Sequence, residues 1–178
     1  MVIRLAKTKD AKIVRRVLSS LAITRTSRER TGFVEYPLPS EREFSKRIKG
    51  NSLFYVYEHE GRVVGFLSAF SDSQLEKLGF SNDIAVKHLL KKPRPFVYLD
   101  QTGLLRSYHK RGWGFELLKR FDNDVKRLGF KTLWCATVRK PVRNKPILTV
   151  LRRLGWKFVE YLPVEEEKVG IEFFRKEL

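Results

Sequence analysis

The sequence predicts the α/β (α+β) class, with one mixed sheet flanked by helices, and three observations lead to this prediction. The chain has 178 residues, a length typical of one domain, so we expect residues 1–178 to form a single domain. Hydrophobic residues make up 42% of the chain, which is enough to build a sizeable core. Strand-like and helical patterns alternate in the order β-α-α-β-β-(α)-β-α-β-α-β-β, without a repeat or a linker.

The N-terminal elements are a strand, a helix and a long loop. Residues 2–6 alternate between apolar and polar side chains, which predicts a strand. Thr8 is the expected N-cap of a helix whose apolar residues recur at helical spacing, namely Ile13, Val14, Val17, Leu18 and Leu21. Residues 24–39 are polar, rich in arginine and interrupted by glycine and proline, which predicts a loop.

A second helix and a β-hairpin follow. Ser40 and Glu43 have the spacing of a capping box, so a short helix begins there and extends to about residue 48. Residues 53–58 and 62–70 are typical of strands, and the Glu60-Gly61 pair between them predicts a tight turn.

The second half of the chain supplies three helical segments and four strands. Helices are expected at residues 73–92, with an interruption at 79–82, at 113–128 and at 145–154. Strands are expected at residues 96–105, 131–138, 156–162 and 169–175. Gly129 and Gly155 mark the ends of the last two helices, because glycine readily adopts the left-handed conformation that ends a helix.

The composition excludes several classes of protein. No apolar run approaches the roughly 20 residues that a membrane-spanning helix needs, and the first residues lack the apolar region of a signal peptide. The single cysteine, Cys135, rules out an internal disulfide and a cysteine metal cluster, and the three histidines form no zinc pattern. We therefore expect a cytoplasmic protein without a metal and without a membrane partner.

The formal charge of +17, from 37 basic and 20 acidic residues, is extreme for a chain of this size. Such an excess favours anionic partners, namely nucleic acid, an acidic protein or a polyphosphate ligand. A proteome that is rich in lysine and arginine throughout accounts for the charge equally well, so both interpretations stay open.

A glycine-containing turn stands between the strand at 96–105 and the helix at 113–128. Its sequence is His109-Lys110-Arg111-Gly112-Trp113-Gly114. The glycines let a ligand approach the backbone closely, and the helix start directs free N–H groups and a partial positive charge at the same point. A pyrophosphate fits such a site. A dinucleotide fingerprint is excluded because Leu117 replaces its third glycine, and a P-loop is excluded because no Gly-Lys-Ser/Thr follows.

This turn and its context resemble the GCN5-related N-acetyltransferase (GNAT) superfamily. The coenzyme-A motif of that family, Gln/Arg-x-x-Gly-x-Gly/Ala after a strand, corresponds to the turn from His109 to Gly114, which Leu104-Leu105-Arg106-Ser107-Tyr108 precedes. A second hallmark, Asn followed by a helix and Leu-Gly-Phe, corresponds to Asn144 and to Leu154-Gly155-Trp156. The order of elements matches over nearly the full length, which implies the GNAT fold with its mostly antiparallel sheet.

The resemblance implies acetyl-CoA as the co-substrate, without a metal. The implied acceptor is a primary amine, on a small molecule or a protein, that attacks directly in a ternary complex. The backbone N–H of Leu104 is implied to lie near the thioester carbonyl, where the end of the strand splays to admit the pantetheine arm. The residues assigned to cofactor binding are Leu104, Leu105, Arg106, His109, Lys110, Arg111, Gly112, Trp113, Gly114 and Asn144.

Four positions depart from the family pattern, and at one of them Arg106 replaces the common proline. His109 stands where Gln or Arg is usual, which changes one pyrophosphate contact. Leu151 occupies the place of the tyrosine that protonates the departing thiolate in many members, and Ala136 is the nearest match to the glutamate base of others. A GNAT-like domain that binds CoA without catalysis is therefore an alternative function, beside a basic nucleic-acid- or ribosome-associated binding protein.

Asp100 is the candidate general base. A carboxylate in an apolar strand costs free energy unless it is satisfied or used, so Asp100 is either this base or a hydrogen-bonded or exposed acid at a strand end. Tyr98 and Tyr108 are candidate proton donors, and packing is the alternative role of each.

The pleat of the strand decides which of these side chains share a face. A regular pleat places four side chains together, those of Tyr98, Asp100, Thr102 and Leu104. Gly103 is either a bulge that turns Leu104 relative to the others or a plain weak point in the strand.

In the loop of residues 24–39, the part from Arg25 to Tyr36 would lie near the acceptor entrance in this family. Its Arg25, Arg28 and Arg30 indicate an acidic acceptor, and Phe33 and Tyr36 are candidates for the pocket wall. A solvated loop without such a role is the alternative. The sequence leaves the oligomeric state open between monomer and homodimer.

Overall fold

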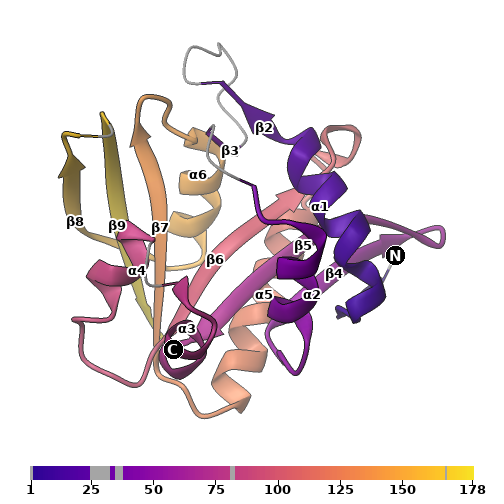
Figure 1. Cartoon of the computed structure of the whole chain (residues 1–178), viewed down its shortest axis with the longest axis horizontal. Coiled ribbons are helices and arrows are strands. Elements are labelled where there is room, and N and C mark those ends of the chain that lie inside the picture. The colour runs from indigo at the N-terminus through magenta and orange to yellow at the C-terminus, as the bar shows by residue number, and fades with distance from the viewer. Residues whose placement is uncertain (1, 25–32, 35–37, 81–82, 167) are drawn as a thin grey trace.

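A computed structural model describes residues 2–24, 33–34, 38–80, 83–166 and 168–178. Its main feature is a seven-stranded sheet with the strand order β1-β4-β5-β6-β7-β9-β8 (Figure 1). The strands are β1 (Val2–Leu5), β4 (Phe54–His59), β5 (Arg62–Ser71), β6 (Val97–Leu104), β7 (Thr132–Lys140), β8 (Lys157–Val164) and β9 (Val169–Glu177). Neighbouring strands run antiparallel except β6 and β7, which are parallel, so the predicted mixed and mostly antiparallel sheet is confirmed.

Six α-helices cover the two faces of this sheet in the described part of the chain. They are α1 (Ala11–Ser20), α2 (Glu41–Ile48), α3 (Asp72–Lys77), α4 (Ile84–Leu89), α5 (Trp113–Arg127) and α6 (Lys145–Arg153). Buried residues of α5 and α6 pack with one set of strand side chains, and those of α1 to α4 pack with the alternate set. We call the two sides the α5–α6 face and the α1–α4 face. None of the described helices is long and apolar enough to cross a lipid bilayer.

Several of these elements start or end at the places that local sequence signals predict. The hydroxyl of Ser40 accepts the N–H of Glu43 at 3.2 Å, and the Glu43 carboxylate accepts the N–H of Ser40 at 2.6 Å, so the predicted capping box begins α2. Glu60 and Gly61 have positive φ angles of 50° and 71°, which suit the tight turn that joins β4 to β5. The interruption predicted around Gly79 separates α3 from α4.

The start of the first helix differs from the prediction. Thr8 is not the cap of α1, because it opens a 3₁₀ turn, Thr8–Asp10, that comes before the helix. The buried carboxylate of Asp10 accepts the N–H of Lys7 at 2.7 Å and pairs with Arg4 at 2.7 Å. This ion pair fixes the chain ahead of α1, so the helix begins two residues later than a cap at Thr8 would place it.

The predicted loop at 24–39 contains a short strand. β3 (Phe33–Val34) pairs in parallel with β2 (Ala22–Ile23), as a separate two-stranded sheet. Phe33 lies against the end of β6, because a Cβ atom built on Gly103 would be 3.4 Å from its ring. The other predicted acceptor-loop residues, Arg25, Arg28, Arg30 and Tyr36, lie outside the described residues, so their roles stay predictions.

Candidate active site

The two parallel strands at the centre of the sheet separate from each other. β6 and β7 pair only through Val97–Leu133, Tyr98–Trp134 and Leu99–Cys135. Beyond Leu99, β6 continues along β5 to Leu104, and beyond Cys135, β7 continues along β9 to Lys140. We call the resulting opening the split. Because α5 follows β6 and α6 follows β7, the N-termini of both helices lie at the end of the sheet where the split opens (Figure 1).

Backbone polar groups of Leu104 point into the split. The N–H of Leu105 donates to the carbonyl of Val64 at 2.8 Å, so this residue faces β5. Successive residues of an antiparallel strand direct their polar groups to opposite sides, so the N–H and C=O of Leu104 point away from β5. The carbonyl oxygen of Leu104 lies 2.7 Å from Nε2 of His109. Since a carbonyl only accepts, the proton of this bond belongs to Nε2.

The turn after β6 ends in a helix start that no side chain caps. Leu105 and Arg106 lead from the strand into a 3₁₀ turn, Arg106–Tyr108. Gly112 is the N-cap of α5 with a φ of +79°, and no side chain bonds to the backbone N–H groups there. The N–H groups of Phe115 and Glu116 both donate to the carbonyl of Gly112, at 3.0 and 3.2 Å. The N–H groups of the first two helical residues therefore remain directed outward, as an anion requires.

The two glycine positions of the turn differ in what a side chain would meet there. At Gly112 the positive φ is the constraint, because a Cβ atom would have no neighbour within 4 Å. At Gly114 a Cβ would lie 3.8 Å from Leu104, an ordinary contact, so the position has room for alanine as well. Lys110 also has a positive φ, of 62°, which gives the turn its shape.

An aromatic cluster supports the turn from within. The ring of Trp113 stacks on Tyr57 at 5.2 Å and on Tyr108 at 5.3 Å, so Trp113 packs inward. His59 lies 5.0 Å from the same indole. The guanidinium of Arg111 lies 5.3 Å from the ring of Tyr108 and 5.4 Å from that of Trp113. Cation–π contacts of this kind hold a positive charge next to the helix start.

Asp100 lies where the split begins, in a β-bulge. On β5, Ser68 pairs with Gln101 and the next residue, Ala69, pairs with Leu99, so Asp100 is the extra residue. The proposed bulge at Gly103 is wrong, because Gly103 pairs with Phe66 in regular register. Packing explains the glycine at position 103 instead, because a Cβ atom there would lie 2.6 Å from Leu21.

The bulge also divides the predicted common face of β6. Tyr98 and the Asp100 carboxylate lie on the α1–α4 face, with Phe70 and Ser68 respectively. After the extra residue the alternation reverses, so Thr102 and Leu104 lie on the α5–α6 face. The prediction that all four share one face is therefore wrong beyond Asp100.

The Asp100 carboxylate is buried and has two polar partners. Its side chain is 8% exposed. The hydroxyl of Ser68 donates to it at 3.1 Å, and Nη1 of Arg47 lies 3.8 Å away. Burial raises the pKa of the Asp100 carboxyl from 3.8 to about 6, the charge of Asp83 contributes in the same direction, and Arg47 and Ser68 oppose the rise. Asp100 is therefore mostly ionised at neutral pH and takes up a proton readily, which suits a general base.

The other candidate residues have clear surroundings. Tyr98 is 4% exposed and packs with α3 and α4, whereas Tyr108 lies beside the turn. Leu151 is fully buried in the core with α5 and offers no proton. Burial raises the pKa of the Cys135 thiol to about 12, so Cys135 stays a neutral thiol. Asn144 caps α6, since its side-chain oxygen accepts the N–H of Ile147 at 3.3 Å.

Three polar residues near the split escaped the sequence analysis. Arg47 and Ser68 reach Asp100 from α2 and β5, which only the folded chain brings together. Glu172, 1% exposed, forms two hydrogen bonds with Arg143, at 3.0 and 2.7 Å, and so anchors the segment that leads to Asn144. An acid inside the apolar β9 pattern was the signal that could have found Glu172.

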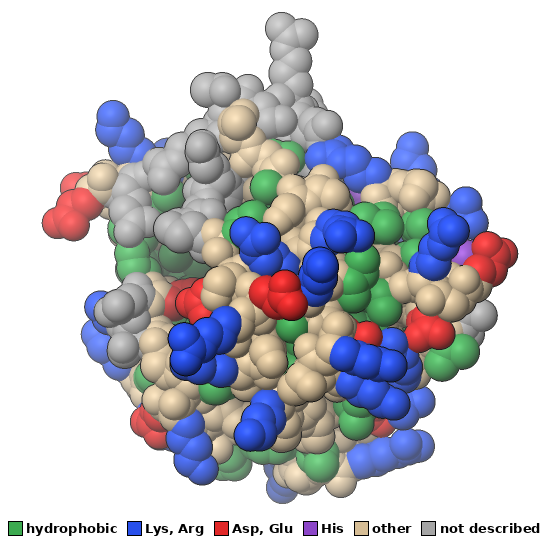
Figure 2. All heavy atoms as spheres, turned by 45° about the vertical axis from the view of Figure 1, so that its right-hand side comes forward, with side chains coloured by type: hydrophobic (Ala, Val, Ile, Leu, Met, Phe, Trp, Pro, Cys, Tyr) green, Lys and Arg blue, Asp and Glu red, His purple; other side chains and the backbone are tan. Residues whose placement is uncertain are grey.

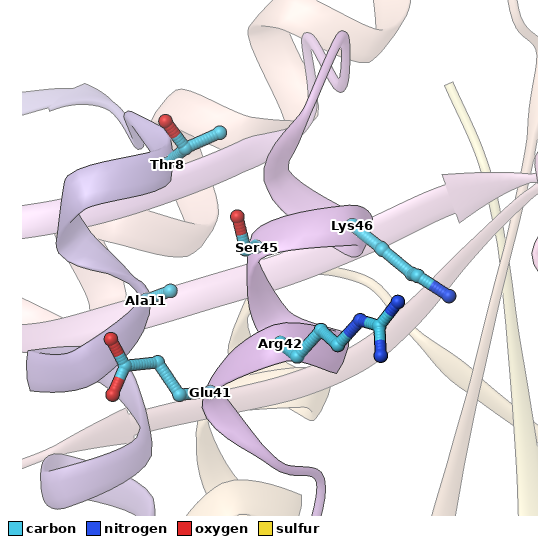
Figure 3. Close-up of a pocket in the computed structure, with 6 residues that line it drawn as sticks. All are labelled: Thr8, Ala11, Glu41, Arg42, Ser45 and Lys46. Atoms are coloured by element: carbon cyan, nitrogen blue, oxygen red, sulfur yellow. The ribbon is translucent and has the colours of Figure 1, made fainter.

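One surface hollow lies apart from the split. It has a volume of about 530 Å³ and lies between α1 and α2, lined by Thr8, Ala11, Glu41, Arg42, Ser45 and Lys46. Figure 3 shows Arg42 and Lys46 extending from α2 away from α1. None of the lining residues belongs to the turn or contacts Asp100, so the hollow is not part of the candidate site. No group of three potential metal ligands occurs within the described ranges.

Several solved structures resemble the chain over nearly its full length. The ribosomal-protein-alanine N-acetyltransferase of Brucella melitensis is 15% identical, with a TM-score of 0.70 over 100% of both chains. The ribosomal-protein-S18-alanine N-acetyltransferase of Escherichia coli is 12% identical, with a TM-score of 0.66 over 99% of this chain and 92% of that one. The Salmonella typhimurium protein yncA, solved with its cofactor acetyl-CoA, is 15% identical, with a TM-score of 0.69 over 100% of this chain and 94% of that one.

No curated protein matches the chain. At these identities the solved structures establish a shared fold. The model of the acetyltransferase (GNAT) family matches residues 21–156, which is most of the chain and includes the split, the turn and Asn144. The chain therefore belongs to the acetyltransferase (GNAT) family.

Proposed function

We propose that the protein is an N-acetyltransferase that transfers an acetyl group from acetyl-CoA to a primary amine. One observation carries the proposal: the split, into which the N–H of Leu104 points, leads directly to the uncapped start of α5 at Gly112. The first feature suits an extended amide chain and the second suits a pyrophosphate. Acetyl-CoA carries both chemical groups in one molecule.

The residues present fit this co-substrate. The N–H groups of Trp113 and Gly114 are placed to receive phosphate oxygens at the start of α5, and Lys110 and Arg111 add positive charge beside them. A side chain at position 112 would be strained by the positive φ, so the backbone there stays open to a ligand. The amide of Asn144, at the start of α6, is proposed to contact the pantetheine arm from the other side of the split.

The chain's own residues then have two tasks in the acyl transfer. Acetyl-CoA supplies the acyl group as a thioester. The N–H of Leu104 stabilises the negative charge that develops on the reacting carbonyl oxygen. Asp100 accepts the proton that the amine loses as its nitrogen forms the new amide bond. Since Leu104 comes four residues after Asp100 along an extended strand, roughly 13 Å away, this proton moves through water.

The departing sulfur has Tyr108 as its proposed proton donor. Leu151, at the place that the resemblance gives to a tyrosine, has no proton to donate. Tyr108 lies beside the turn, stacked on Trp113, whereas Tyr98 is enclosed between β6 and the α3–α4 pair, where packing accounts for it. Tyr98 is therefore the weaker of the two candidates.

Two alternative functions are each favoured by a specific observation. Leu151 and Ala136 favour a domain that binds CoA without catalysis, because neither side chain can donate or accept a proton. The charge of +17 favours an anionic partner, nucleic acid included. Figure 2 shows the Lys and Arg side chains of one face dispersed, with acidic side chains between them, rather than gathered into a single track. The class of acceptor is open. Two structural neighbours are named for ribosomal-protein alanine, but their sequence identities of 15% and 12% are too low to assign their substrate to this chain.

Mass spectrometry of the purified protein, followed by an amine-acceptor panel with acetyl-CoA, tests the proposal. We expect a CoA species to accompany the native protein and one acetyl group to appear on at least one amine. Binding of acetyl-CoA without transfer to any amine would favour the non-catalytic alternative. Absence of binding at millimolar acetyl-CoA would refute the proposal.

A further inference from the structure

The guanidinium of Arg47 lies between an aromatic ring and the Asp100 carboxylate. Its central carbon is 4.4 Å from the ring centroid of Phe80, and its Nη1 is 3.8 Å from Oδ2 of Asp100. The side chain of Arg47 is 20% exposed, so it is largely withdrawn from solvent although it is charged. A charged side chain in such a position has lost hydration, and the two contacts offset that cost.

The fold keeps Arg47 in this position from two sides. The neighbours Phe44 and Ile48 anchor α2 in the core, at 0% and 3% exposure, so the helix that carries Arg47 cannot shift freely. Phe80 is 8% exposed and packs on Phe70 at a ring distance of 5.0 Å, so the surface under the guanidinium is itself fixed. Because both supports are fixed, the guanidinium is preorganised with Nη1 close to the Asp100 carboxylate.

The charge balance around Asp100 depends on this one cation. Each packed element contributes one titratable or polar group: Arg47 from α2, Ser68 from β5, Asp83 at the start of α4 and Cys135 from β7. Asp83 is acidic and makes ionisation of Asp100 harder, whereas the Cys135 thiol is neutral and Ser68 contributes a hydrogen bond. Arg47 is therefore the one positive charge among the groups that act on Asp100 within the described chain.

We infer that Arg47 is a positioning residue: held over the ring of Phe80, its guanidinium fixes the Asp100 carboxylate at the base of the split and keeps it ionised at neutral pH. The catalytic consequence rests on the proposed function, in which Asp100 accepts the proton of the amine. The electrostatic part does not, because it concerns the ionisation of Asp100 alone. Arg47 touches no reacting atom in this proposal and acts through Asp100.

The test is the pH titration of Asp100, monitored through the ¹³C NMR signal of its side-chain carboxyl. The signal is assigned by its absence in Asp100→Asn. Arg47→Met removes the charge and keeps the length of the side chain, so we expect the pKa of Asp100 to rise by about one unit. At pH 7 the ionised fraction then falls from about 90% to about half. Phe80→Leu should raise the pKa by less, since the cation stays but loses its support. Arg42→Met, on the exposed side of the same helix, is the matched control and should leave the titration unchanged.

A titration of Asp100 that is unchanged in Arg47→Met would overturn the inference, and so would an equal shift in Arg42→Met. If circular dichroism shows that Arg47→Met does not fold, Arg47→Gln, which also removes the charge, replaces it, and an unchanged titration in Arg47→Gln overturns the inference. The acid limb of the pH–rate profile, measured with a reactive amine from the panel, separates the two proposals. A limb that moves with the NMR titration supports both. If the NMR pKa of Asp100 shifts but the apparent pKa of the acid limb does not, the role of Arg47 is supported and Asp100 is excluded as the base.

Discussion

Nε2 of His109 lies 2.7 Å from the carbonyl oxygen of Leu104, so the first residue of the CoA-type motif is bonded to the strand end that lines the split. The histidine thus ties the proposed pyrophosphate site to the proposed thioester site. It also occupies one polar group of Leu104 and leaves the neighbouring N–H pointing into the split.

Substitution of His109 should separate the two halves of the site. His109→Leu leaves the partly buried carbonyl of Leu104 without its partner, which costs about 1 kcal/mol. We expect acetyl-CoA to bind roughly tenfold or more weakly, as measured by isothermal titration calorimetry. His109→Gln, whose amide can donate to the same carbonyl, should bind within a few-fold of the natural protein. Equal affinities in His109→Leu and the natural protein would contradict the role given to this bond.

Gly112 and Gly129 offer a matched pair at the two ends of α5. Both have positive φ, 79° and 84°, and a side chain would meet no atom within 4 Å at either. Glutamate at either position therefore adds the same backbone strain, about 1–2 kcal/mol. Gly112→Glu should also abolish the rise in melting temperature that acetyl-CoA produces, because it places a negative charge in the anion site. Gly129→Glu should keep that rise, and its loss in both variants would refute this location.

Gly65 is crowded by the strand end opposite it. A Cβ at Gly65 would lie 2.3 Å from Cδ2 of Leu104 and 2.8 Å from the carbonyl oxygen of Gly103. Gly65→Ala should push Leu104 out of place, lower stability by about 1–3 kcal/mol and weaken CoA binding. Gly170→Ala is a control of equal crowding, because its Cβ would lie 2.2 Å from the hydroxyl of Tyr161 on β8. A loss of stability without a loss of CoA affinity in Gly65→Ala would contradict the placement of Leu104.

The pH dependence follows from the raised pKa of Asp100. A base must be unprotonated, so turnover should fall as the pH drops through about 6, and Asp100→Asn should remove this limb as well as lower the rate. Stability changes in the opposite sense. Because the folded-state pKa lies above the ordinary 3.8, the folded protein binds the proton more tightly, and its stability should decrease as the pH rises from about 4 to about 6. Chemical denaturation of the natural protein and Asp100→Asn across this range measures the difference, and identical curves would contradict the burial of the carboxylate.

The sequence was sufficient for features that are set by near neighbours in the chain. The capping box of Ser40 and Glu43, the turn at Gly61 and the helix start at Gly112 all depend on residues within one turn of each other. The order of the elements then fixed the fold class through the family resemblance. Thr8 failed as a cap because Arg4 and Asp10 form a partly buried ion pair, which depends on how β1 packs and not on helix propensity.

The surroundings of Asp100 could not be predicted in the same way. The bulge exists because β5 and β6 slip by one residue between Ser68 and Ala69, and such a slip leaves no mark in the β6 sequence alone. Arg47 and Phe80 reach the carboxylate from segments far apart in the chain. Charge, burial and register in a central strand are tertiary properties, so the sequence named the candidate base but not the groups that control it.

A crystal structure of the protein with acetyl-CoA tests the central claim most directly. The pyrophosphate should lie within hydrogen-bonding distance of the N–H groups of Trp113 and Gly114, the pantetheine arm should run between β6 and β7, and the thioester oxygen should face the N–H of Leu104. Acetyl-CoA bound elsewhere, with the start of α5 and the split both vacant, would contradict the account.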